Sequence, residues 1–149
     1  MSLVIASIDI DAPVQDVWDH IMDPSKMGTW VSIVDRIERV DSGPIRPGFR
    51  MSQALCLRGV RFKVHWTLEE LDAPRFARWE GKGPARSTAV TENRLTARDG
   101  ATHFDYRNEF HTPFGPLGAA ASKVIVGGIP EKEAKASLRR LREILEVQG

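Results

Sequence analysis

The chain has 149 residues, of which 42% are hydrophobic and 28% are charged, so it is long enough for one domain with a proper core and too short for two. Its 21 Lys and Arg residues balance 20 Asp and Glu residues, and the formal charge of +1 gives no basic field that would attract a phosphate backbone. We therefore expect a single domain over residues 1–149 and no nucleic acid partner.

The cysteine content and the N-terminus predict the compartment. A single cysteine, Cys56, cannot form an internal disulfide, which suits a reducing environment. Residues 1–11 lack the basic start and long apolar core of a secretory signal, and no apolar run approaches the roughly 20 residues that span a bilayer. The sequence thus predicts a cytoplasmic protein without stable membrane insertion.

The first thirty residues predict one strand and two short helices. Residues 3–10 alternate with a period of two, which is typical of a strand with one buried face; the inward set is Val4, Ala6, Ile8 and Ile10. After Pro13, apolar side chains follow at helical spacing: Val14, Val17, Trp18 and Ile21. Asp23 and Pro24 then form an N-cap and first-turn pair for a second short helix that runs into Trp30.

Residues 31–111 are divided by Gly-, Pro- and Asp-rich turn signals into six strands. The two clearest are Val60–Leu71 and Thr102–Phe110, in which apolar and polar side chains alternate. Each therefore has one dry face and one wet face, and the alternation assigns Val60 to the dry face of the first.

The C-terminal segment predicts a long helix. After residues 113–116 the apolar period changes from 2 to 3.6, and one side of a helix reaching about Val147 is lined by Ala134, Leu138, Leu141 and Leu145. Glu131 and Lys135 form an i,i+4 pair on its wet side. Gly127, Gly128 and Pro130 predict either a kink or a start of the regular helix near Pro130.

These elements predict an α+β fold with about seven antiparallel strands and one helix long enough to cover them. A sheet of this size must curl around its single covering helix, and such a curved sheet leaves an interior gap that apolar side chains line without filling. We expect this gap to be a site for a small hydrophobic molecule.

Several motifs occur in a fixed order along nearly the whole chain. They are Ile10–Trp18, Asp23–Pro24 with Trp30, Pro47–Met51, Glu70–Arg75 with Trp79–Gly81, and Thr102–Tyr106 with Glu109–Phe110. Together they resemble the START-like helix-grip superfamily (SRPBCC), and within it the polyketide cyclase/dehydrase and lipid-transport type. The resemblance implies a helix-grip fold, with the curved sheet wrapped around the C-terminal helix, and a cavity for lipids, polyketides, steroids or other aromatic compounds. It implies no single reaction, because one fold supports many functions.

The sequence departs from the usual family pattern at Gly127–Pro130, where many relatives keep a smooth helix. Glycines at such a place let a backbone approach a ligand closely.

Strand alternation assigns a set of side chains to the face toward the helix. The ligand-binding candidates are Met51, Gln53, Phe62, Val64, Trp66, Thr91, Asn93, Phe104, Tyr106 and Asn108. Burial of a polar member without a partner would cost about 1–3 kcal/mol. Two explanations stay open: these groups bond to one another, the backbone or water, or they anchor a ligand. Our hypothesis is that Asn93, Tyr106 and Asn108 orient a ligand carbonyl or hydroxyl.

The tryptophans have different expected roles. Trp18 is expected in the core, because large aromatic residues usually are, whereas Trp66 is the better cavity candidate. Trp30 lies where the family places its entrance, so both packing and gating are open for it.

Metal and cofactor sites are not predicted. The alternation sends His65, His103 and Asp105 to the wet face, and no dense His or Cys spacing indicates a metal. Cys56 is in phase with outward residues or close to a turn, and it is interpreted as structural or incidental rather than as a nucleophile.

The leading functional prediction is a non-catalytic carrier or sensor of a hydrophobic metabolite. No nucleophile motif is present, and the inward sheet face offers no obvious Asp, Glu or His base. The alternative is a polyketide cyclase/aromatase-type enzyme, in which Tyr106 donates a proton and Asn93 or Asn108 stabilises an oxyanion. A second alternative is a chaperone-regulating partner-binding module, which would require an exposed apolar patch.

Overall fold

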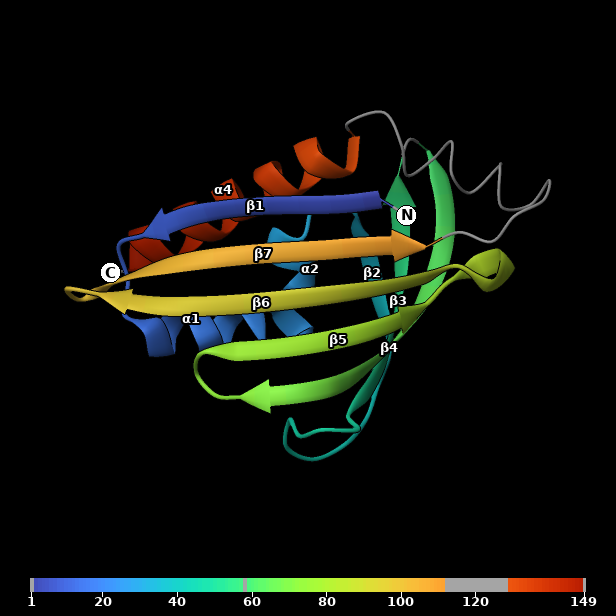
Figure 1. Cartoon of the computed structure of the whole chain (residues 1–149), viewed down its shortest axis with the longest axis horizontal. Helices are drawn as coiled ribbons and strands as arrows, with labels where there is room; N and C mark the ends of the chain where they lie inside the picture. The colour runs from blue at the N-terminus through green and yellow to red at the C-terminus, as the bar shows by residue number, and fades with distance from the viewer. Residues whose placement is uncertain (1, 58, 112–128, 149) are drawn as a thin grey trace.

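The computed structural model describes residues 2–57, 59–111 and 129–148. Within them, seven strands form one antiparallel sheet in the order β1-β7-β6-β5-β4-β3-β2 (Figure 1). The strands are β1 (Ser2–Ile10), β2 (Val34–Val40), β3 (Arg50–Leu57), β4 (Val60–Asp72), β5 (Phe76–Lys82), β6 (Thr88–Arg98) and β7 (Ala101–His111). The helices are α1 (Val14–Ile21), α2 (Met27–Trp30) and α4 (Ile129–Gln148), with 3-10 turns at Pro24–Lys26 and Pro84–Arg86.

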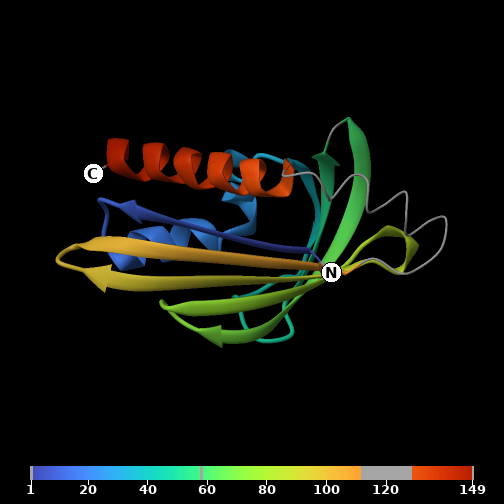
Figure 2. The ribbon, with the colours of Figure 1, turned by 45° about the horizontal axis from the view of Figure 1, so that its top comes forward.

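The sheet is strongly curved, and its concave side faces the helices. In Figure 2, α4 extends along this side, while β3 and β4 turn away from the direction of β6 and β7. The longest ladder, β6 with β7, runs without a register shift, whereas β4 has an irregularity against β5 between Leu68 and Glu70. Such irregularities increase the local bend of a strand. The predicted α+β architecture, with two short helical segments after the first strand and a long C-terminal helix, is confirmed.

The second short helix differs from its prediction. Asp23 is the expected N-cap, since its side chain accepts a hydrogen bond from the backbone N–H of Ser25 at 3.0 Å. The segment that follows is divided into a 3-10 turn and the separate four-residue helix α2. The expected helix start near Pro130 agrees with α4, which begins at Ile129, while Gly127 and Gly128 lie outside the described residues.

The core lies where α4 and α1 meet the strands near β1. Val17, Leu141 and Ile10 have no accessible surface, and Leu138 retains 2%. All four side chains of the predicted α4 stripe are buried: Ala134, Leu138, Leu141 and Leu145. The i,i+4 pair is also present, with Glu131 Oε1 at 3.1 Å from Lys135 Nζ.

One inward assignment on β4 is wrong. Val60 is 46% exposed although it is in phase with the buried Val64 and Leu68. It is the first residue after the Gly59 turn, at the end of the β3–β4 hairpin, where the expected alternation no longer produces burial.

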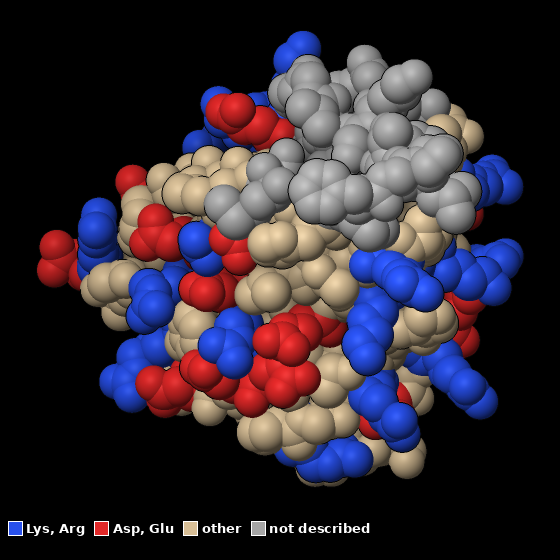
Figure 3. All heavy atoms as spheres, turned by 45° about the vertical axis from the view of Figure 1, so that its right-hand side comes forward, with Lys and Arg blue, Asp and Glu red and all other residues tan. Residues whose placement is uncertain are grey.

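The outer surface carries both signs of charge. Figure 3 shows acidic and basic side chains together on the visible face. Arg107, for example, lies 3.8 Å from a carboxylate oxygen of Glu92 and 3.6 Å from one of Glu109. Among the described residues, no helix has the length and apolar character needed to cross a membrane.

Candidate functional site

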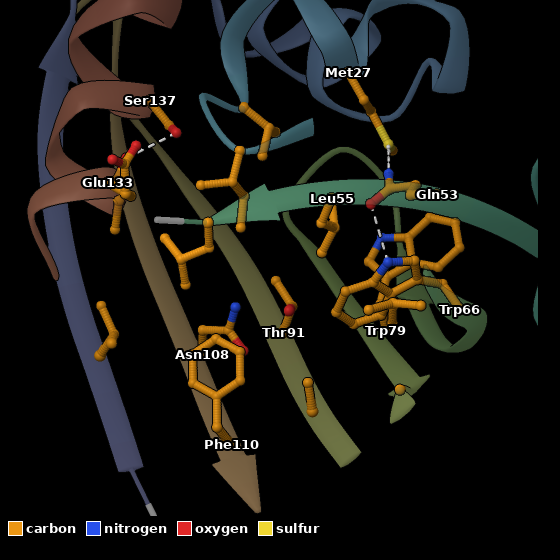
Figure 4. Close-up of a pocket in the computed structure, with 18 of the residues that line it drawn as sticks. Met27, Gln53, Leu55, Trp66, Trp79, Thr91, Asn108, Phe110, Glu133 and Ser137 are labelled. Carbon is orange, nitrogen blue, oxygen red and sulfur yellow. Dashed lines mark hydrogen bonds between the residues drawn. The ribbon is translucent and has the colours of Figure 1, made fainter. Parts of the chain in front are cut away.

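An apolar cavity lies between the sheet, α2 and α4. Its volume is about 150 Å³, which resembles the volume of apolar cavities that admit a benzene-sized molecule. Figure 4 shows Glu133 and Ser137 of α4 on one side and Gln53, Trp66 and Trp79 on the other. The apolar members of the lining include Val4, Ile21, Met27, Val31, Ile33, Leu55, Leu57, Ala89, Phe110 and Leu138.

Nine of the ten ligand-binding candidates line this cavity. They are Met51, Gln53, Phe62, Val64, Trp66, Thr91, Asn93, Tyr106 and Asn108. Phe104 does not line it, because it lies within the core with no exposed surface and packs edge-on against Trp30 at 6.2 Å between ring centroids. Phe104 points to the inward face of the sheet, as the alternation predicts. It lies four residues before Asn108, in the part of β7 where this face packs against Trp30.

A polar cluster occupies the β6–β7 wall. Asn93 is paired across the sheet with Tyr106, and Thr91 with Asn108, so the four side chains are neighbours on one face. The Asn108 amide donates to the Tyr106 hydroxyl at 2.7 Å. The side-chain oxygens of Asn93 and Asn108 are buried and have no hydrogen-bond partner among the described residues. The hydrogen-bonding capacity of the cluster is therefore only partly used by these residues. Both amide oxygens could accept a hydrogen bond from a bound molecule.

Tyr106 is held in its protonated form. Burial raises the pKa of its phenol, and the hydrogen bonds of Asn108 and Thr91 only oppose that rise. The neutral hydroxyl can therefore both donate and accept a hydrogen bond in the cavity.

Gln53 belongs to a second polar group, on β3. Its Oε1 accepts from the indole N–H of Trp66 at 3.0 Å, and its Nε2 lies 3.2 Å from the sulfur of Met27 (Figure 4). Gln53 is 5% exposed, so this contact is shielded from solvent.

Sequence reasoning missed the helix side of the cavity. Glu133 and Ser137 of α4 line it, one turn apart, with the Ser137 hydroxyl donating to the Glu133 carbonyl at 2.8 Å. The Ser32 hydroxyl donates to the Glu133 carboxylate, and the Ser32 N–H donates to the Ser137 hydroxyl at 2.9 Å. An acidic residue thus lines the cavity, supplied by the helix rather than by the sheet, and its carboxylate is held by Ser32. Glu133 precedes Ala134 of the apolar stripe, so it lies at the margin of the helix face that the stripe defines.

The other aromatic side chains have distinct places. Trp18 is a core residue with 7% exposure, as predicted. Trp30 and Trp79 both line the cavity, and the buried Trp30 indole nitrogen has no acceptor among the residues described.

The histidines expected on the wet face do lie there. The His65 ring nitrogen is 2.8 Å from the Ser52 hydroxyl, and His103 lies between Asp9, at 2.6 Å, and Asp105, at 3.1 Å. The hydrogen bond from His103 lowers the pKa of the Asp9 carboxyl. In the part of the chain that the structure describes, no group of three or more His, Cys, Asp or Glu side chains is arranged to hold a metal ion.

A second hollow, of about 710 Å³, lies on the outside between α1 and the segment after β2. It is broad and lined partly by charged groups such as Asp19, Asp23 and Asp41. The cavity between the sheet and α4 is the better candidate site, since apolar walls with a few placed polar groups are the usual form of a small-molecule site.

Comparison with known proteins agrees with this arrangement. Residues 1–146 match the family model described as polyketide cyclase/dehydrase and lipid transport. A relative from Mycobacterium tuberculosis, printed as "Uncharacterized protein Rv1546", is 26% identical over 137 residues, which cover 91% of this chain and 95% of the relative.

Solved structures share the fold at low sequence identity. The Zhui aromatase/cyclase from Streptomyces sp. R1128 is 14% identical, with a TM-score of 0.83 over 99% of this chain and 94% of that chain. The protein TTHA0849 from Thermus thermophilus is also 14% identical, with a TM-score of 0.80 over 99% of both chains. The helix-grip fold is thereby shown. This chain belongs to the polyketide cyclase/dehydrase and lipid transport family.

Proposed function

We propose that the protein binds a small hydrophobic ligand in the cavity between the sheet and α4, as a carrier or sensor. The observation that carries the proposal is the apolar cavity of about 150 Å³, with a polar cluster on one wall that is incompletely satisfied by the described residues. Apolar walls supply affinity, and a few polar groups fix the orientation of the bound molecule. The nine cavity-lining candidates are proposed as its binding residues.

The test combines recovery of a ligand with closure of the cavity. Native mass spectrometry of gently purified protein, followed by denaturing extraction, is expected to reveal a small hydrophobic molecule. Binding of the bicyclic hydrocarbon indane, followed by calorimetry, provides a probe that needs only apolar contact. Ala89→Phe fills the cavity from β6, whereas Ala97→Phe places the same ring at an exposed position on that strand.

The expected result is loss of indane binding in Ala89→Phe and its retention in Ala97→Phe. Equal indane affinity in the wild type and a folded Ala89→Phe variant would place the binding site elsewhere. Failure of indane to bind the wild type, with no molecule recovered on extraction, would contradict the carrier function.

A second candidate function is cyclisation of a polyketide-like substrate, favoured by Glu133 in the cavity. The Glu133 carboxylate takes a proton from the carbon between two ketones, and the enolate carbon forms a bond to a third carbonyl carbon. The neutral Tyr106 hydroxyl then gives its proton to the resulting alkoxide, and the proton held by Glu133 returns to the Tyr106 phenolate through water. The new hydroxyl finally leaves as water together with the second hydrogen of the attacking carbon, which forms a ring double bond. The aromatase/cyclase activity named for the Streptomyces structure supports this reaction class, within a shared fold.

Turnover of a short poly-β-ketothioester, followed as loss of water by mass spectrometry, tests this second function. Glu133→Gln and Tyr106→Phe are each expected to lower the rate by about 100-fold, the contribution typical of one general acid or base. Glu131→Gln, an exposed change on the same helix, is the control. Turnover that survives both cavity substitutions would remove these residues from the mechanism.

A further inference from the structure

The Gln53 amide is fixed in one orientation. Indole nitrogen carries only a donor hydrogen, so the atom of Gln53 that lies 3.0 Å from Trp66 Nε1 must be the carbonyl oxygen. The amide nitrogen then necessarily faces the other way. Trp66 thereby determines which end of Gln53 is offered to the cavity.

The amide nitrogen of Gln53 is a strong donor with weak acceptors. It lies 3.2 Å from the Met27 sulfur and 3.9 Å from the Met51 sulfur, and both are thioethers. A thioether is a weak acceptor compared with a carbonyl or hydroxyl oxygen. Because Gln53 is 5% exposed and lines the cavity, this donor is buried at the ligand site with its hydrogen-bonding capacity poorly used.

The methionine occupies the position that a better acceptor would take. Met27 lies on α2, is 6% exposed and also lines the cavity. Its unbranched side chain changes rotamer more readily than a branched one, so it can withdraw when a ligand enters. Figure 4 shows Met27 pointing at the Gln53 amide from the side opposite Trp66.

We propose that the cavity selects ligands that carry a neutral carbonyl oxygen, which accepts a hydrogen bond from Gln53 Nε2 in place of the Met27 sulfur. The inference rests on the proposed binding function and adds the chemical class of the ligand. It assigns Trp66 the role of a positioning residue that acts through Gln53.

The experiment compares 1-indanone with indane, which share a bicyclic skeleton and differ in one carbonyl. The measured quantity is the ratio of their dissociation constants in each variant, because the ratio between variants cancels the different solubilities of the two probes. Gln53→Met removes the donor and keeps a side chain of similar length. It is expected to reduce the preference for indanone by about fivefold, the typical worth of one neutral hydrogen bond.

Two methionine substitutions give the opposite test and its control. Met27→Leu removes the competing sulfur and is expected to raise the preference for indanone about twofold to threefold, with conservation of volume. Met22→Leu makes the same change at a residue that is 4% exposed and outside the cavity lining, and it should leave the ratio unchanged. Trp66→Phe, which frees the Gln53 amide to rotate, should lower the preference while indane still binds.

The outcomes separate the two proposals. Indane binding that is lost in Ala89→Phe, with a carbonyl preference that depends on Gln53 and Met27, supports both. Indane binding with an indanone ratio unchanged in folded Gln53→Met and Met27→Leu variants would overturn the carbonyl assignment and leave the binding function intact. Failure of both probes to bind the wild type would overturn the binding function itself.

Discussion

Gly81 provides a direct test of the cavity wall. It lies on β5 opposite Trp66 of β4, and a Cβ added there would be 2.8 Å from two ring carbons of Trp66 and 2.8 Å from Val64 Cγ1. Ordinary contact begins at 3.4 Å, so Gly81→Ala requires the ring and the valine to move by about 0.6 Å. Because both neighbours line the cavity, the substitution should disturb the cavity as well as the sheet.

The size of the effect follows from two opposing contributions. Overpacking a closely packed interior costs about 1–3 kcal/mol, while alanine in a strand interior gains about 0.5–1 kcal/mol over glycine. We expect Gly81→Ala to lose about 1–2 kcal/mol of unfolding free energy, measured by urea denaturation. Displacement of the Trp66 ring should also lengthen its 3.0 Å hydrogen bond to Gln53 and shift the tryptophan emission.

Gly28→Ala is the matched control. A Cβ at Gly28 would find its nearest neighbour, Val34 Cγ1, at 3.9 Å, which is ordinary contact. The control should be as stable as the wild type or slightly more stable. If Gly81→Ala unfolded at the same urea concentration as Gly28→Ala, the packing of Trp66 over Gly81 would be refuted.

Three further predictions concern stability. Burial, with a smaller contribution from Lys26, lowers the pKa of His20 from its usual 6.5, so the folded protein favours the neutral ring. The free energy of unfolding should therefore fall as the pH drops below about 6.5, where the unfolded chain binds the proton more readily. His20→Gln should flatten that dependence in urea melts at pH 5 and pH 7.5, and an unchanged slope would contradict the assignment. Leu141→Ala removes a side chain with no exposed surface and should lower the free energy of unfolding, measured in urea, by about 2–5 kcal/mol. Val147→Ala, at a side chain that is 85% exposed, should lower it by less than about 0.5 kcal/mol, and equal losses would refute the core placement of Leu141. Thr102→Val removes the buried 2.8 Å hydrogen bond to the Ala12 carbonyl and should lower the free energy of unfolding by about 1 kcal/mol, seen as a lower melting temperature. An unchanged melting temperature would show that this hydrogen bond does not stabilise the fold.

The fold was predictable because its signals are periodic and local. Alternation in residues 3–10 identified the buried face of β1, and the 3.6-residue period identified the buried side of α4. Both patterns arise from backbone geometry, which does not depend on distant parts of the chain. The division of the second short helix was not predictable in this way, because an N-cap and a proline signal only where a helix begins.

The site was only partly predictable, because alternation reports the face of a strand and not the position along it. Phe104 and Asn108 share a face of β7, yet one lies in the core and the other in the cavity. Glu133 was missed because an apolar stripe identifies the centre of a buried helix face and not its margin. Ser32, which bonds to Glu133, lies in a turn 101 residues away, and no sequence spacing connects the two.

The arrangement along β7 explains how one small chain holds both a core and a cavity. Asn108 follows Phe104 by four residues, a rise of about 13 Å along an extended strand, which is enough to pass from one region to the other. At Phe104 the inward face meets Trp30, and at Asn108 the same face lines the cavity with an amide oxygen that has no partner among the described residues. Sheet curvature therefore separates the packed core from the cavity along a single strand. Packing substitutions at Phe104 should act on folding, whereas polar substitutions at Asn108 should act mainly on the proposed ligand binding.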